Sequence, residues 1–207
     1  MPTIAPSSVP TLPATSIVAG PAGINVDVGN NVQIGVLDPG KFPLTVTGTN
    51  GLSLASVRGS VSNLVNGVLT PGSNGIASLD LSGVAGTALS ALVGTSGSTL
   101  KICAQGSTTN CSSVNLTANP AGLALSSSLA SIALQPGTST PLTVTALPLL
   151  GSGPFTALSS NANVIVTSTG LGTFTVAAAA SAGVPTSATV TVTDADGHTL
   201  SIPVSVL

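Results

Sequence analysis

The most conspicuous shortage in this sequence is charge. Of 207 residues, three are basic and five are acidic, and all five acids are aspartates. No residue between Lys101 and Asp194 carries a formal charge. Exposed surface is normally built from charged side chains, so this surface must consist mainly of Ser, Thr, Asn, Gly and Ala. Three dispersed cations cannot neutralise a track of phosphates, which excludes nucleic acid as a partner.

The chain is also poor in aromatic residues and in long apolar runs. It has no Trp, no Tyr and three Phe, whereas a membrane barrel has aromatic girdles at both interfaces. The longest apolar run, "TVAAAASAGV", is far shorter than a membrane-spanning helix requires. We therefore predict no membrane span. The first residues show no secretory signal, so we expect either export by another route or a start at a mature or engineered end.

What the sequence has in abundance is alternation with a period of two. Segments such as "INVDV", "NVQIGV" and "ATVTVT" place every second apolar residue on one face, and turn signals such as "DPGK", "TPGSNG" and "DADG" separate them. Val and Thr favour half-buried pleats, and short strands between Gly/Pro turns are typical of a β-sandwich or barrel. The pattern predicts an all-β protein.

Several short segments occur twice. "PAGI" at Pro21 returns as "PAGL" at Pro120, and "LDPGKFPLTVTG" at Leu37 returns as "LQPGTSTPLTVTA" at Leu134. The segment "TLKICAQGSTTNCSSVNL" can likewise be aligned with "TVTVTDADGHTLSIPVSV". A period of about 100 residues indicates tandem domains, because solenoid repeats are shorter. We predict an extended Pro/Ser-rich tail over residues 1–20 and two β-sandwich domains over residues 21–119 and 120–207.

Two such units resemble the bacterial immunoglobulin-like domain family. The resemblance covers residues 21–207 and rests on the early "PGxxxPLTVT" strand and on the closing hairpin "ATVTVTDADGHTLSIPVSV". It implies two tandem Ig-like antiparallel sandwiches in an extracellular or cell-surface stalk, adhesin or fibre. The sequence departs from the antibody pattern, because it lacks Trp and because Cys103 and Cys111 are too close in sequence to bridge two sheets.

The two cysteines share an outward parity. In their hairpin, Leu100 and Ile102 face the core on one strand and Val114 does so on the other, which turns Cys103 and Cys111 to the same outer face. A cross-strand disulfide is predicted if the register sets them opposite each other. Two unpaired thiols in a reducing cytosol are the alternative. Two cysteines and a distant histidine cannot complete a zinc site.

No constellation in the sequence points to catalysis or to a cofactor. The only histidine, His198, belongs to the hairpin turn "DADGHT", and the chain has no Glu. A catalytic triad needs a nucleophile, a base and an orienting group in a cleft, so we expect no enzyme. Asp194 and Asp196 form a weak candidate for calcium. The favoured alternative is a turn in which their side chains bond the local backbone and Gly197 takes a positive φ.

The tail predicts self-association. Four prolines space residues 1–20 as an extended segment. Its candidate inter-subunit contacts are the apolar residues Ile4, Val9, Leu12, Ile17 and Val18. An uncharged surface repels other copies poorly, and an extended segment can complete a neighbour's sheet edge. We therefore expect a subunit of an extracellular surface filament, a fimbrium-like homopolymer. The alternatives are a monomeric stalk or adhesin that binds a host receptor or carbohydrate through its loop tips, and a phage or virion decoration module.

Overall fold

The computed structural model describes residues 16–27, 30–50, 52, 57–58, 64–65, 68–83, 89–94, 96–118, 124–146 and 151–207. Strands dominate this part of the chain. The strands of the first half are β1 (Val18–Gly20), β2 (Gly23–Val26), β3 (Asn31–Leu37), β4 (Leu44–Gly48), β5 (Val57–Arg58), β6 (Leu64–Val65), β7 (Val68–Leu69), β8 (Ile76–Gly83), β9 (Ser98–Ala104) and β10 (Cys111–Ala118), with helix α1 (Leu89–Val93) between β8 and β9. Those of the second half are β11 (Leu125–Ser127), β12 (Leu129–Leu134), β13 (Ser139–Ala146), β14 (Thr156–Ser159), β15 (Val164–Gly170), β16 (Thr173–Ala178), β17 (Thr186–Thr193) and β18 (Thr199–Val206).

The predicted alternation is visible in the burial of these strands. Along β17, buried Ala188, Val190 and Val192 alternate with half-buried threonines. Because successive side chains of a strand point to opposite faces, one face of each such strand can enter a core while the other stays polar.

The second half of the chain forms a two-layer sandwich. One sheet has the order β11-β13-β16-β15, and the facing strands follow β14-β17-β18-β12. This is the arrangement of an immunoglobulin-like sandwich, in which strands A, B, E and D face strands C, F and G. A cluster of buried residues from Leu125 to Val206 fills the space between the layers.

The first half repeats this strand order and adds β7 and β6 beside β4. β1-β3-β8-β5 forms one layer and β2-β10-β9-β4-β7-β6 forms the other, with a separate buried cluster that begins at Ile17. The predicted all-β, Ig-like sandwich fold is thus confirmed. Pairing is mostly antiparallel, and the described parallel pairs are β2–β10, β12–β18 and β12–β3.

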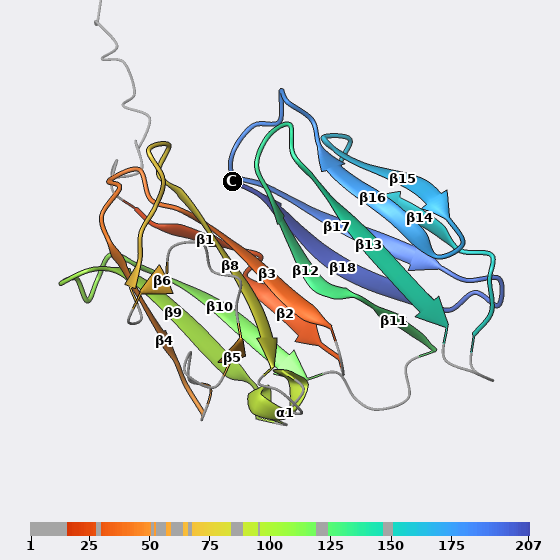
Figure 1. Ribbon diagram of the computed structural model, residues 1–207, viewed down its shortest axis with the longest axis horizontal. Helices are drawn as coiled ribbons and strands as arrows, with labels where there is room; N and C mark the ends of the chain where they lie inside the picture. Colours follow the sequence, from red (N-terminus) through yellow and green to blue (C-terminus); the bar gives the residue numbers. More distant parts are fainter. Residues whose placement is uncertain are drawn as a thin grey trace, which may run out of the picture.

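The last of these pairs joins the two sandwiches. β12 pairs with β18 on one side and with β3 of the first sandwich on the other, so one sheet runs from β14 through β12 and β3 to β5. Figure 1 shows the two sandwiches side by side across this junction. Ala130 of β12 packs in the first core, although Leu129 and Ile132 of the same strand belong to the second.

The repeated Pro-Gly segments occupy different positions in the two sandwiches. The first connects β3 to β4 and the second connects β12 to β13. By strand order, however, β13 corresponds to β3 and β14 to β4. The closing hairpins do correspond, since β9–β10 and β17–β18 hold the same place in both sheets. The alignment of the Pro-Gly segments as equivalent positions was therefore wrong.

Candidate functional site

The junction between the two sandwiches is closed by side chains as well as by the strand ladder. The register shifts between Leu129 and Ser131 of β12 where the strand passes β3. At this irregularity the hydroxyl of fully buried Ser131 accepts the Gln33 N–H at 2.9 Å and donates to the Gln33 carbonyl at 2.7 Å. The Gln33 side-chain oxygen accepts the Ala133 N–H at 3.4 Å. Two side chains thus replace backbone partners that the bulge removes.

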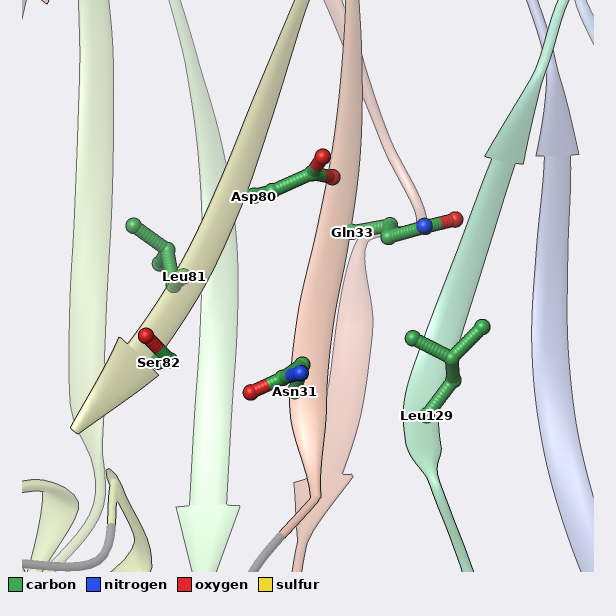
Figure 2. Close-up of a pocket in the computed structure, with 6 residues that line it drawn as sticks. All are labelled: Asn31, Gln33, Asp80, Leu81, Ser82 and Leu129. Carbon is green, nitrogen blue, oxygen red and sulfur yellow. The ribbon is translucent and has the colours of Figure 1, made fainter. Parts of the chain in front are cut away.

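A pocket of about 210 Å³ lies beside this junction, on the face of the shared sheet that points away from the cores. Its lining comes from three strands: Asn31, Gln33, Asp80, Leu81, Ser82 and Leu129. Figure 2 shows the Asp80 carboxylate extending from β8 toward β3, while the Gln33 side chain turns away toward β12. Cross-strand register places Gln33 opposite Asp80, and the two side chains diverge.

Asp80 is the ionisable group of this pocket. Burial raises the pKa of its carboxyl above the usual value of 3.8, because the charged form loses contact with water. Within the described part of the chain, no hydrogen bond or ion pair to this carboxylate is found. Sequence reasoning did not single out Asp80. Its place between Leu79 and Leu81 in an alternating strand marks it as outward-facing, but only the arrival of β12 turns that outer face into a pocket.

A second hollow, of about 130 Å³, lies along the same junction. Its lining includes Gly35 and Ser78 of the first sandwich and Ala133 and Leu207 of the second. A Cβ atom at Gly35 would lie 2.9 Å from Leu207 Cδ1 and 3.3 Å from Ala133 Cβ. Glycine therefore allows the close approach of the second sandwich at this point.

The predicted disulfide is confirmed. Cys103 of β9 and Cys111 of β10 are directly opposite each other in the hairpin ladder, and their sulfurs are bonded. Leu100, Ile102 and Val114 are fully buried in the first core, as the parity predicts. The disulfide closes the turn end of this hairpin.

Asp194 organises the turn between β17 and β18. Its Oδ1 accepts the N–H groups of Asp196 at 3.0 Å and of His198 at 2.8 Å. Its Oδ2 lies 3.0 Å from His198 Nδ1 and accepts the Ser152 N–H at 3.3 Å. Burial alone raises the pKa of Asp194, but the hydrogen bonds and charge of His198 and the Ser152 N–H outweigh it and lower the pKa.

This geometry bears on the calcium candidate. Asp194, Asp196 and His198 offer oxygen and nitrogen atoms within 4.8 Å of one another. Both Asp194 oxygens already accept protein hydrogens, and the Asp196 carboxylate accepts the Ser152 hydroxyl at 2.7 Å. Gly197 has a φ of 88°. These features are those of a hydrogen-bonded turn, the interpretation that the sequence favoured.

Of the five candidate contact residues of the tail, the structure describes two. Ile4, Val9 and Leu12 lie outside the described residues. Ile17 is buried in the first core, and its N–H donates to Asn110 Oδ1 at 3.1 Å. Val18 begins β1, which pairs with β3.

These contacts place the end of the expected tail inside the first sandwich. A contact of Ile17 with another subunit would require the side chain to leave its own core. In the part of the chain that the structure describes, no helix has the length and hydropathy to cross a membrane.

No family model matches this chain, and no curated protein matches it. Among solved structures, domains 5–6 of the S-layer protein SbsC are 18% identical at a TM-score of 0.36, over 93% of this chain and 96% of that one. The tandem Ig repeats of Dlar are 12% identical at 0.35, over 94% and 99%. The adhesin InvE of Yersinia pseudotuberculosis is 15% identical at 0.32, over 93% and 58%. Similarities at such TM-scores carry no argument about function.

Proposed function

We propose that this protein is a non-enzymatic, extracellular structural protein, a subunit of a bacterial surface filament that polymerises with copies of itself through its N-terminal segment. The observation that carries this proposal is the free side of the second sandwich. β14 ends one sheet and β15 ends the other, and the two strands contact each other. Neither strand contains a charged residue or a proline.

Free strand edges of this kind are prone to pair with another chain. Soluble proteins usually protect them with charge, proline or strong bulges. Here the protection is slight, since the one irregularity of β15 lies at its end, between Ser168 and Gly170. Large apolar side chains are exposed nearby, with Leu158 at 75%, Ile165 at 52% and Leu171 at 93%. These features support pairing with an extended segment of a second copy.

The placement of the N-terminal segment supports an open chain of subunits. The described residues begin in the first sandwich, where Ile17 and β1 lie beside β3 and the disulfide hairpin. The free edges β14 and β15 belong to the second sandwich, on the side away from β3. A donor and an acceptor on different parts of one subunit make a head-to-tail contact, which generates filaments when it does not close into a ring.

The shared sheet joins the two sandwich domains of the proposed subunit. We assign residues 21–119 and 120–207 to two sandwich domains that the β3–β12 junction holds in one orientation, and Ile17 and β1 pack with the first of them. A rigid subunit transmits force along a filament without bending at a linker. The disulfide supports an oxidising, extracellular compartment, and the only histidine is engaged in a turn.

Light scattering and negative-stain microscopy test this proposal on the full chain and on a variant that lacks residues 2–15. The deletion stops before Ile17, because this residue belongs to the first core. We expect regular fibres from the full chain and monomers from the truncated one. Monomers from both would overturn the filament proposal and leave the monomeric stalk or adhesin, or the virion module, as the working interpretation.

A matched pair of charge variants tests the acceptor edge. Ile165→Lys places a charge on the free strand β15, and Ser201→Lys places one on β18, which is paired on both sides. Both positions are exposed. We expect Ile165→Lys to prevent fibres and Ser201→Lys to leave them intact. Equal behaviour of the two variants would show that β15 is not the acceptor.

A further inference from the structure

Asp80 differs from the other buried or half-buried carboxylates that the structure describes in detail. Asp38 accepts the N–H groups of Gly40 at 3.0 Å and Phe42 at 2.8 Å, and Asp194 accepts two N–H groups of its own turn. Asp80 is half-buried with no such donor among the described residues. A carboxylate removed from water without a partner is costly, and a buried polar group without one calls for an explanation.

The surroundings of Asp80 define what kind of partner fits. Figure 2 shows the Asn31 side chain extending from β3 toward β8 and Leu129 on β12, while the Ser82 hydroxyl on β8 points away from β3. The lining of the pocket therefore includes a carboxylate from β8, an amide from β3 and an aliphatic side chain from β12. Its volume of about 210 Å³ is below the range of about 300–1,000 Å³ that drug-sized ligands occupy.

We propose that this pocket binds a primary ammonium group on an aliphatic stem, the chemistry of a lysine side chain or of a small alkylamine. An ammonium has three donors and no acceptor, which complements the Asp80 carboxylate and the amide oxygen of Asn31 in the lining of the pocket. The methylene stem packs against Leu129, as lysine stems do on apolar surfaces. The cation supplies the opposite charge that Asp80 lacks. The proposal does not depend on filament formation.

The charge around the pocket is almost entirely that of Asp80. β3 and β12 contain no ionisable residue, and β8 contains only Asp80. In β5, Arg58 is opposite Ser82 in the register, which makes it the basic residue of the neighbouring strand. Arg58 is thus the competitor within the chain that a test must address.

Titration of the ¹⁵N-labelled full chain with n-butylamine at neutral pH, followed by amide chemical shifts, tests the proposal. 1-Butanol is the matched neutral probe. We expect saturable shifts confined to β3, β8 and β12, with dissociation constants in the millimolar range and no such shifts with butanol. Asp80→Asn should weaken binding at least tenfold, whereas Asp196→Asn, which removes an exposed acid of the β17–β18 turn, should leave it unchanged.

Two outcomes overturn the proposal. One is the absence of saturable shifts, or equal shifts in wild type and Asp80→Asn. The other is binding that appears only in Arg58→Gln, because Asp80 would then be the partner of Arg58 and the pocket would be occupied from within. Butylamine binding to wild type that Asp80→Asn removes supports the site.

A further arm separates the two sources of the ammonium group. The chain has two lysines, Lys41 before β4 and Lys101 in β9, and both are exposed. If a lysine of a second copy supplies the group, Asp80→Asn and a variant that carries both Lys41→Gln and Lys101→Gln should each reduce self-association in sedimentation velocity. If neither variant changes self-association while butylamine still binds, the ligand is a free amine or a lysine of another protein. Fibres that persist in Asp80→Asn leave the filament proposal intact even where the amine site fails.

Discussion

Ser131 offers the sharpest test of how the two sandwiches are joined. Its hydroxyl satisfies both the N–H and the carbonyl of Gln33, at 2.9 and 2.7 Å, and its side chain is fully buried. Ser131→Ala removes one oxygen atom and leaves every strand in place. We expect the substitution to destabilise the junction specifically, because both backbone groups of Gln33 lose their partner at once.

The size of the effect follows from the two groups left unpaired. A buried donor or acceptor without a partner costs about 1–3 kcal/mol. We therefore expect Ser131→Ala to lower the free energy of unfolding by about 2–4 kcal/mol, which combines the two groups with partial relief by neighbouring structure. For a natural domain this is a large part of the total stability.

Urea unfolding followed by circular dichroism measures the loss, and amide hydrogen exchange locates it. We expect the midpoint to fall and the Gln33 amide to lose protection, since that N–H donates to the hydroxyl. Ser113→Ala is the control, because Ser113 is an exposed serine of β10. A change below about 0.5 kcal/mol, within the usual range for surface substitutions, together with a still-protected Gln33 amide, would refute this account of the junction.

Three further predictions test the turns and the disulfide. Gly75→Ala and Gly106→Ala both place a Cβ at a positive φ, of 78° and 81°, but only at Gly75 would that Cβ lie 2.5 Å from a backbone carbonyl oxygen. In urea unfolding, Gly75→Ala should therefore lower the free energy of unfolding by at least about 1 kcal/mol more than Gly106→Ala. Equal losses of stability in the two variants would contradict the clash. Replacing Cys103 and Cys111 by Ala should lower the free energy of unfolding by about 2.6 kcal/mol. A reductant should lower the unfolding midpoint of the wild type but not that of the variant. Identical midpoints for oxidised and reduced wild type would count against this prediction. Folding lowers the pKa of Asp194, so its contribution is fully present above the ordinary value of 3.8 and is lost as pH falls through the folded value. Asp194→Asn should flatten that decline in pH-dependent thermal unfolding, and an unchanged decline below about pH 4 in the variant would exclude Asp194 as its source.

The sequence was sufficient for features that depend on local pattern. Strand alternation predicts which face of β9 and β10 enters the core, and the same parity places Cys103 and Cys111 on one outer face. The turn at Asp194 was also predicted, because aspartate followed closely by glycine favours side-chain bonds to the local backbone. In each case neighbouring residues along the chain or across one hairpin decide the geometry.

The junction could not be predicted in this way. Gln33 and Ser131 occupy outward positions of alternating strands, and outward polar residues normally face solvent. Only the pairing of β3 with β12 buries Ser131 and makes a pocket beside Asp80. Which sheet edges meet depends on the placement of whole sandwiches, and the two edges carry no charge pattern that distinguishes them from other strands of this chain.

The two Pro-Gly segments are similar in sequence but not equivalent in position, and their role as connections between layers explains why. In both copies it links a strand of one layer to a strand of the facing layer, so it serves as a corner between sheets. The first corner is held by the Asp38 carboxylate, which accepts the Gly40 and Phe42 N–H groups. The second is held by the Thr138 hydroxyl, which accepts the Gln135 N–H at 2.9 Å and donates to the Gln135 carbonyl at 2.8 Å.

Two different hydrogen-bond sets thus stabilise corners of similar sequence. Any connection that crosses between layers needs a tight turn followed by a new alternating strand, and Pro-Gly with Leu-Thr-Val-Thr supplies both. A sandwich has several such crossings, so this motif can recur at non-equivalent ones. The closing hairpin is a better guide to equivalence, because its two strands must pair with each other and with fixed neighbours in the sheet. Register across β17 and β18 is tied to the core by every second residue, and a slip of one residue would turn the whole buried face to solvent.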